Sequence, residues 1–294
     1  MNRQPVDGII LKGIGGFYYV EASDSEIYEC KAKGIFRKKG VTPLAGDRVK
    51  ITLNDNAENT IDEIMPRKSE MLRPPVANVD RLFIVSSTVE PKPVLFIIDK
   101  LTVLAEDQGI EPIVVFTKCD MASGEEYAGI YRKAGIKVFC VSNKTGEGAR
   151  EVADEFTGHI SALCGNSGVG KSSLLNAIFP DLDLKTAQIS EKLGRGRHTT
   201  RHSELFKVNG GYVADTPGFA SIVSEDSENI DPENIPFGFR EFVPHLGKCR
   251  FSTCTHVKDK GCKIIEAVQN GEISESRHQS YCLMLEHAKK QKKY

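Results

Sequence analysis

A glycine-rich segment in the middle of the chain has the residue types of a phosphate-binding loop. Residues 165–172 read GNSGVGKS and fit the pattern GxxxxGK[ST], between an apolar run that can end a strand (159–164) and the first turns of a helix (173–179). Glycines allow successive backbone N–H groups to surround an anion at the positive end of a helix dipole. We expect Lys171 to reach the β- and γ-phosphates and Ser172 to bind Mg²⁺. The alternative is a glycine-rich turn beside a surface lysine.

A second segment has the residues of a guanine-specificity loop. A predicted buried strand (112–116) leads into Thr117-Lys118-Cys119-Asp120, which fits the pattern [NT]KxD. The Asp120 carboxylate can accept hydrogen bonds from the N1–H and the exocyclic amine of guanine, whereas adenine presents an acceptor at ring N1. The stem of Lys118 can lie over the base. The alternative interpretation of Asp120 is a residue that starts a helix.

A third loop follows the next predicted strand (137–141) and reads Ser142-Asn143-Lys144-Thr145-Gly146. It is similar to the second guanine loop, where backbone N–H groups and Ser142 would brace the base and the Asp120 loop. The same residues also suit an ordinary turn.

Two later segments have the character of nucleotide switches. The basic, polar stretch 193–202 contains Thr199 and Thr200, and a threonine there can order against Mg²⁺ and the γ-phosphate. A predicted strand (211–214) then leads into Asp215-Thr216-Pro217-Gly218. Asp215 can hold Mg²⁺ through water, and the Gly218 N–H can sense the γ-phosphate.

The C-terminal part of the chain contains a dense group of metal-ligand residues. Cys249, Cys254, His256 and Cys262 follow the spacing C-x4-C-x-H-x5-C. Three thiolates and one imidazole make up a closed tetrahedral Zn²⁺ site, which predicts a structural rather than a catalytic metal. The alternative is four unrelated small residues. The other cysteines have no partners in spacing and are interpreted as ordinary thiols.

Composition limits the class of protein. The chain has 294 residues, enough for two or three domains, and 39 basic against 40 acidic residues, so a nucleic-acid surface must be a local patch. No apolar stretch approaches 18 residues and no signal-peptide core follows the N-terminus, so we expect a soluble cytoplasmic protein without a membrane role.

Residues 1–66 are predicted to form a small RNA-binding β-barrel. About five short apolar or aromatic runs separated by Gly, Asn, Asp and Pro favour an OB-fold. A basic group with aromatic neighbours resembles an RNA-binding face, and a solvated charged loop is an equal alternative. The basic residues are Lys31, Lys33, Arg37, Lys38, Lys39, Arg48 and Lys50.

The remainder is predicted to form a linker, an α/β domain and a helical module. Residues 67–79 contain two prolines and little periodicity, as a linker does. Residues 80–224 alternate buried strands (80–85, 112–116, 137–141) with helices (95–108, 127–134), which predicts a parallel sheet. Residues 225–294 begin with an acidic link, contain the Cys₃His group and are predicted to be helical over 263–290.

The order of the loops is unusual. In Ras-like proteins the phosphate loop comes first, whereas here both guanine loops precede it and the switch segments follow it. The chain is therefore a circular permutation of that sheet. With GNSGVGKSSLLNA, GRGRHTTRH, DTPGF and GKCRFSTCTH between a barrel and a Cys₃His module, it resembles the ribosome small subunit-dependent GTPase A (RsgA) family along its whole length.

The resemblance implies a GTPase of late small-subunit assembly. Such a protein binds the small ribosomal subunit and its rRNA near the decoding region in the GTP state, and hydrolysis to GDP and phosphate favours release. We further expect a monomer. The residues assigned to GTP binding are Thr117, Lys118, Asp120, Ser142, Asn143, Gly165, Asn166, Ser167, Gly168, Val169, Gly170, Lys171, Ser172, Ser173, Thr199, Thr200, Asp215 and Gly218.

Two departures from Ras-like proteins affect the expected mechanism. Phe219 stands where those proteins have a water-orienting Gln, so intrinsic hydrolysis should be slow and another group must position water. His198, which resembles the family's suspected catalytic histidine, is the candidate, together with Lys171 and a Mg²⁺ site of Ser172, Asp215 and Thr200 (or Thr199). Thr117 stands where many GTPases have Asn, and we expect it to weaken the bracing between loops.

Two other functions are compatible with parts of the sequence. One is a P-loop ATPase with no ribosomal role, from which Asp120 distinguishes a GTPase. The other is a non-enzymatic RNA-binding protein with an inert nucleotide fold. The presence of Lys171, Ser172, two threonines and Asp215 argues against the second.

Overall fold

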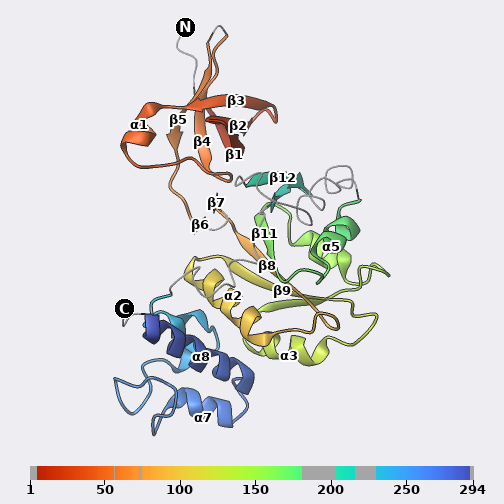
Figure 1. Ribbon diagram of the computed structural model, residues 1–294, viewed down its shortest axis with the longest axis vertical. Coiled ribbons are helices and arrows are strands. Elements are labelled where there is room, and N and C mark those ends of the chain that lie inside the picture. The colour runs from red at the N-terminus through yellow and green to blue at the C-terminus, as the bar shows by residue number, and fades with distance from the viewer. Residues whose placement is uncertain (1–4, 56, 73–74, 181–202, 216–229, 292–294) are drawn as a thin grey trace. The chain divides into compact units, whose positions relative to one another are not determined.

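The computed structural model describes residues 5–55, 57–72, 75–180, 203–215 and 230–291 (Figure 1). The chain forms two compact units, each assembled from segments that are distant in the sequence. The first unit is Met1–Arg81, Ala153–Leu163 and Asp181–Phe219, and the second is Leu82–Val152, Cys164–Pro180 and Ala220–Tyr294. No helix among the described residues is both long and apolar enough to cross a bilayer.

The first unit begins with a closed five-stranded barrel, which confirms the predicted OB-like fold. Antiparallel pairs join β1 to β2 and β4, β2 to β3, and β4 to β5, and the parallel pair of β3 and β5 closes the barrel. Alternating side chains such as Ile10, Val20, Ile51 and Ile61 are fully buried inside it, as period-two patterning predicts. The strands are β1 (Val6–Ile14), β2 (Phe17–Ala22), β3 (Ile27–Ala32), β4 (Arg48–Thr52) and β5 (Asn59–Ile64).

A short helix between β3 and β4, α1 (Gly34–Lys38), was not predicted. Five residues are too few to show a 3.6-residue hydrophobic period, and α1 buries none of its side chains. The N-terminal segment is therefore not entirely β.

The segment predicted as a linker contains a small hairpin of β6 (Glu70–Leu72) and β7 (Pro75–Ala77). Arg67 holds its start against the barrel, because its Nε and Nη2 donate to the two carboxylate oxygens of the buried Asp47, each at 2.8 Å. Asn78 holds its end by donating to Gly46 O at 2.9 Å. The segment is thus more ordered than its proline content suggests.

Three further strands belong to the first unit. They are β11 (Ile160–Cys164), β12 (Glu204–Val208) and β13 (Gly211–Asp215). β13 lies parallel to β11, with Ala214 opposite Ala162, and antiparallel to β12. β11 continues into the second unit at Cys164, so the glycine-rich loop belongs to that unit.

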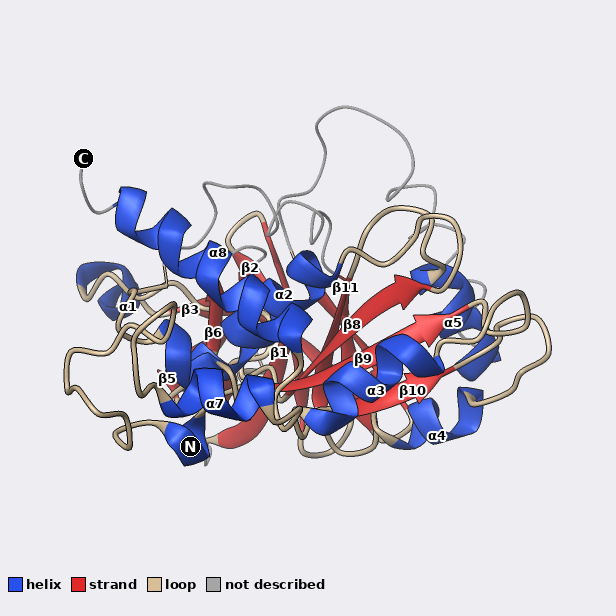
Figure 2. Ribbon diagram, turned by 90° about the horizontal axis from the view of Figure 1, so that it is seen from below, coloured by secondary structure: helices blue, strands red, loops and turns tan. Residues whose placement is uncertain are grey.

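The second unit contains the neighbouring strands β8 (Arg81–Ser87), β9 (Glu111–Thr117) and β10 (Lys137–Cys140) (Figure 2). β9 and β10 are parallel, and β8 and β9 are buried along nearly their whole length, as expected of strands covered on both faces. Its helices before the C-terminal part are α2 (Leu95–Asp107), α3 (Glu125–Lys133), α4 (Ala149–Asp154) and α5 (Lys171–Ile178).

The C-terminal part of this unit has two helices where one was predicted. α7 (Lys263–Gln269) ends before Gly271, whose φ of +74° suits a helix C-terminus, and α8 (Glu275–Gln291) starts anew. The prediction of a continuous helix over 263–290 is therefore wrong at 270–274. Two 3₁₀ turns, η3 (Ile235–Gly238) and η4 (Val243–His245), precede α7.

The C-terminal part is fixed to α2 by buried charges. The Arg277 side chain on α8 is fully buried and donates from Nη1 to Asp99 Oδ1 at 2.9 Å and to Thr102 Oγ1 at 3.0 Å. Its Nε donates to Glu241 Oε1 at 2.8 Å. Arg240 adds ion pairs to Glu106 and Glu111.

Candidate functional site

The glycine-rich loop connects β11 to α5 and has a backbone that only glycine suits. Gly165 has φ of +139°, and a Cβ there would lie 2.1 Å from Val85 O. Gly170 has φ of +93° and precedes the first residue of α5, Lys171. The loop therefore presents backbone N–H groups at a helix N-terminus, the arrangement that binds phosphate.

Lys171 lies across this loop. Its ammonium donates to Gly165 O at 2.7 Å and to Asn166 O at 2.8 Å. Burial lowers the pKa of Lys171, and the neighbouring Cys164 thiol opposes that shift. A phosphate group would compensate this desolvation by supplying negative oxygens to the same ammonium.

The remaining predicted residues of the loop have different exposures. Ser167, Gly168 and Ser173 are exposed, whereas Val169 is buried and Ser172 is half-buried in the first turn of α5.

Thr117 is the last residue of β9, and Lys118, Cys119 and Asp120 form the loop that follows it, next to the glycine-rich loop. Lys118 has φ of +60°, an unusual conformation for a residue with a side chain, and its Nζ donates to Gly168 O at 3.1 Å. Asp120 is exposed, so its carboxylate is accessible to a base. Cys119 N donates to Val141 O at 3.1 Å and joins this loop to the one that follows β10.

The loop after β10 is closed by its own hydrogen bonds. The buried Ser142 accepts from Thr145 N through Oγ at 3.1 Å, and Gly146 N donates to Ser142 O at 2.9 Å. Asn143 Nδ2 donates to Gly170 O at 3.2 Å. Ser142 thus shapes the turn, while Asn143 contacts the glycine-rich loop.

Thr117, which is expected to weaken the bracing between loops, does contact the glycine-rich loop, and the weaker bracing stays a prediction. Thr117 is fully buried, and its hydroxyl lies 2.5 Å from Val169 O and 3.2 Å from Ser86 O. The three loops of the second unit therefore interlock: Lys118, Thr117 and Asn143 each bond one of three consecutive carbonyls of the glycine-rich loop.

Sequence reasoning missed one loop of this site. Lys118 Nζ also donates to Glu90 O, and Thr88 Oγ1 donates to Lys118 O at 3.0 Å. Both contacts come from the connection between β8 and α2. A signal was present, since Pro91 and Pro93 mark a shaped loop directly after a buried strand.

The switch residues are predicted in the segments 193–202 and 215–219. His198, Thr199, Thr200, Gly218 and Phe219 lie outside the described residues. The backbone of Asp215 is described and ends β13, at the same edge as the end of the parallel strand β11.

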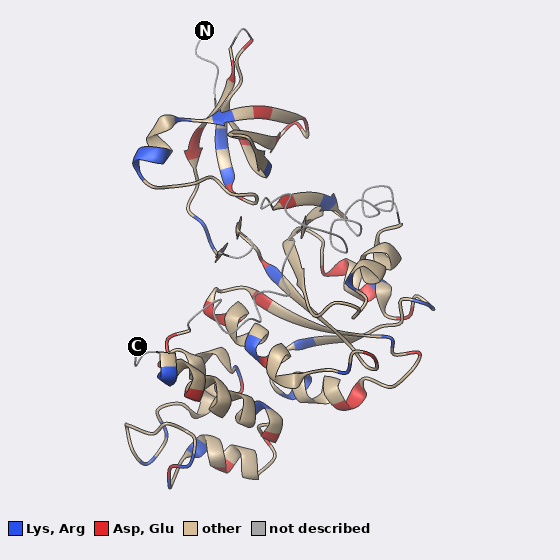
Figure 3. Ribbon diagram, viewed as in Figure 1, with Lys and Arg blue, Asp and Glu red and all other residues tan. Residues whose placement is uncertain are grey.

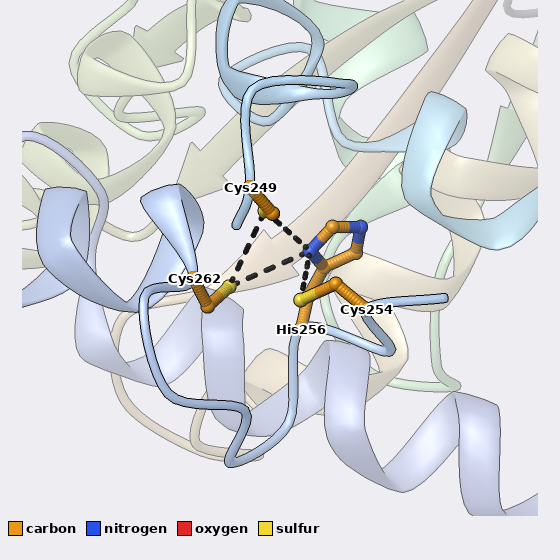
Figure 4. Close-up of side chains that lie close together, drawn as sticks. All are labelled: Cys249, Cys254, His256 and Cys262. Carbon is orange, nitrogen blue, oxygen red and sulfur yellow. Dashed lines mark hydrogen bonds between the residues drawn. The ribbon is translucent and has the colours of Figure 1, made fainter. Parts of the chain in front are cut away.

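The Cys₃His group is brought together in the C-terminal part (Figure 4). The ligand atoms of Cys249, Cys254, His256 and Cys262 lie within 4.8 Å of one another. The Sγ atoms of the three cysteines lie 3.4–3.5 Å from His256 Nδ1, and those of Cys249 and Cys262 are 3.9 Å apart. Tetrahedral Zn²⁺ with ordinary bond lengths requires S···N edges of about 3.6 Å and S···S edges of about 3.8 Å. The three S···N distances and the Cys249–Cys262 S···S distance therefore fit zinc.

The predicted basic group is divided among several elements of the barrel, and Arg48 and Lys50 lie in β4. Lys31 pairs with Glu58 and Lys33 with Asp62, so these charges are compensated. The basic residues at the end of α1 and just beyond it are exposed and form no ion pair with any described residue. Figure 3 shows the blue part of the ribbon at α1. These residues are Arg37, Lys38 and Lys39.

Comparison with known proteins gives consistent matches over the whole chain. The model of the RsgA GTPase family matches residues 64–224, and that of the RsgA N-terminal domain matches residues 7–61. A protein of Halalkalibacterium halodurans named small ribosomal subunit biogenesis GTPase RsgA is 43% identical over 292 residues, covering 97% of this chain and 98% of its own. A protein of the same name from Caldanaerobacter subterraneus is 44% identical and covers 98% of this chain and 97% of its own.

Two solved structures are also similar. YjeQ from Thermotoga maritima has a TM-score of 0.82 at 34% identity, covering 97% of this chain and 99% of its own. YloQ, described as a circularly permuted GTPase, has a TM-score of 0.82 at 33% identity, covering 98% of this chain and 96% of its own. These matches show that the chain belongs to the RsgA family of GTPases.

Proposed function

We propose that the protein is a GTP hydrolase that acts in late maturation of the small ribosomal subunit. It binds the subunit and its rRNA in the GTP state and leaves after subunit-stimulated hydrolysis to GDP and phosphate. The observation that carries the nucleotide part is the convergence of Lys118, Thr117 and Asn143 on the phosphate loop, with the Asp120 carboxylate exposed beside it. The ribosomal part is supported by the names of the relatives.

The proposed roles of the parts follow the predicted division. The barrel (1–66) contacts rRNA, and Arg37, Lys38 and Lys39 on and beside α1 neutralise backbone phosphates. The segment 67–79 joins it to the GTPase domain (80–224), and the C-terminal domain (225–294) is held by one structural Zn²⁺ on its Cys₃His cluster. The protein acts as a monomer in the cytoplasm.

At the reaction centre we assign Mg²⁺ to Ser172, Asp215 and Thr200 (or Thr199), bound together with GTP. Bound there, Mg²⁺ would supply positive charge beside the transferred phosphoryl group, and the Lys171 ammonium would neutralise charge that develops on it. His198 positions water, because Phe219 cannot. Ser142, Ser173 and the phosphate-loop backbone complete the GTP site.

GTP turnover should rise by about tenfold or more when purified small subunits are added, because Phe219 stands where Ras-like proteins have the glutamine that orients water. Phosphate release measured with small subunits, large subunits and neither provides the test. Stimulation by large subunits alone, or by neither, would exclude the proposed partner. In the same assay His198→Ala should lose the stimulation and still bind nucleotide.

Asp120→Asn should change the preferred base from guanine to xanthine. The amide removes the acceptor that guanine N1–H and the exocyclic amine require, and we expect a loss of about 100-fold or more in GTP affinity. Competition of GTP and XTP against a labelled nucleotide measures the change. Unaltered preference would favour a P-loop ATPase or an inert fold instead.

A further inference from the structure

The position that holds Asn in many GTPases holds Thr117 here, which changes what can support the phosphate loop. A hydroxyl has a single proton, whereas an Asn amide has two. Thr117 Oγ1 is 2.5 Å from Val169 O and 3.2 Å from Ser86 O, so its one proton goes to Val169 O. The next peptide of the phosphate loop must be supported by another group.

Asn143, in the loop after β10, provides that support. Its Nδ2 donates to Gly170 O at 3.2 Å. A Cβ placed on Gly170 would lie 3.1 Å from Asn143 Nδ2 and 3.7 Å from Thr117 Oγ1, so both side chains lie on the same side of this residue. The closed turn at Ser142 and the Cys119–Val141 hydrogen bond fix Asn143 relative to β9.

We propose that Thr117 and Asn143 divide the bracing of the phosphate loop between them, and that Asn143 is a positioning residue for bound nucleotide. Carbonyl and N–H groups of a peptide point in opposite directions. Holding the carbonyls of Val169 and Gly170 from outside therefore directs the N–H groups of Gly170 and Lys171 toward the phosphates. Gly170 O also accepts from Leu174 N at 2.8 Å, so Asn143 anchors the N-terminus of α5 as well.

An energetic detail separates this role from ordinary stabilisation. Asn143 Oδ1 is buried without a hydrogen-bond partner among the described residues. A buried unpaired acceptor is unfavourable, and its cost opposes the benefit of the bond made by Nδ2. Asn143→Ala removes both, so we expect the melting temperature of the nucleotide-free protein to change little while nucleotide affinity falls.

The test measures binding of fluorescent mant-GDP to the full-length protein. Asn143→Ala and the near-isosteric Thr117→Val should each weaken binding about fivefold, the value of one ordinary hydrogen bond. In each single variant the other side chain still holds the loop. The double variant should therefore lose more nucleotide affinity than the product of the two single losses, that is, more than about 25-fold. The control is Asn209→Ala, which removes an amide that bonds Ala153 O and Thr157 Oγ1 outside the three loops and should leave affinity unchanged.

Unchanged affinity in Asn143→Ala, or an equal loss in Asn209→Ala, would overturn the proposal. So would a loss of affinity accompanied by a matching fall in melting temperature, since that would show a purely structural role. The inference rests on the nucleotide site of the proposed function and not on its ribosomal partner. Binding is measured without ribosomes, so failure of one is distinguishable from failure of the other.

Discussion

Arg277→Met should destabilise the protein by about 3–5 kcal/mol, the usual cost of leaving buried carboxylates without their partner. Arg277 and Asp99 are 0% and 1% exposed, and Glu241 is 5% exposed. The guanidinium also lies 4.6 Å from the centre of the Phe239 ring, so little water can replace it. For a chain of this size, the melting temperature should fall by roughly 10 °C.

The matched control is Arg132→Met on α3. Arg132 pairs with Glu125 at 2.6 Å, but the two side chains are 47% and 63% exposed. Exposed ion pairs contribute about 0–1 kcal/mol to stability, so the melting temperature of this variant should be close to that of the parent. Equal effects of the two substitutions would show that the buried network does not hold the C-terminal part.

The cost of Arg277→Met should depend on pH. Burial raises the pKa of Asp99, and the Arg277 charge opposes that rise. Removing Arg277 raises the Asp99 pKa further, so the folded variant binds a proton more tightly than the unfolded chain does. Stability from such a group is fully present below the unfolded pKa and is lost as pH rises through the folded pKa. The difference in the free energy of unfolding between the variant and the parent should therefore shrink as pH falls from 7 toward about 4. A constant or growing difference would contradict this explanation.

Removing zinc should have a comparably large effect. Structural zinc contributes about 10–16 kcal/mol in zinc-finger peptides, and even a third of that would lower the melting temperature by roughly 10 °C. The effect should spread to α8, because His278 Nε2 contacts His256 O at 2.7 Å and the Tyr281 hydroxyl donates to Thr255 O at 2.8 Å. Helix α8 also carries Arg277, so the cluster and the buried ion pairs support the same helix.

Metal analysis and unfolding measurements check this expectation. The parent should contain one zinc per chain, and Cys262→Ser should lose it together with the stability. Cys282→Ser, in α8 but outside the cluster, should retain both. A zinc-free parent, or a Cys262→Ser protein of unchanged stability, would show that the cluster is not a structural zinc site.

The predictability of the fold varied along the chain for identifiable reasons. The strands with continuous apolar runs, such as β8 and β9, were evident because burial on both faces leaves no polar positions. Helix α1 was missed because it is too short for periodicity. The break between α7 and α8 is marked in the sequence by Asn270-Gly271, a pair that commonly ends a helix. The prediction of one long helix does not take this pair into account.

Short sequence motifs are enough to predict the chemistry of this protein. Phosphate cradling, guanine readout and zinc binding depend on residue types at fixed short spacings, which the chain displays within GNSGVGKS, TKCD and C-x4-C-x-H-x5-C. The order of these motifs also indicates the permuted domain, because both guanine loops come before the phosphate loop in the chain, whereas in Ras-like proteins the phosphate loop comes first.

The contacts by which these segments support one another are visible only in the folded chain. The bonds of Thr117 and Asn143 to the phosphate loop span 52 and 27 residues, and the pairing of Arg277 with Asp99 spans 178. No local pattern records such contacts, because they depend on which carbonyl or carboxylate the folded backbone brings near. An arginine in a polar helix looks solvent-exposed until the helix that covers it is known.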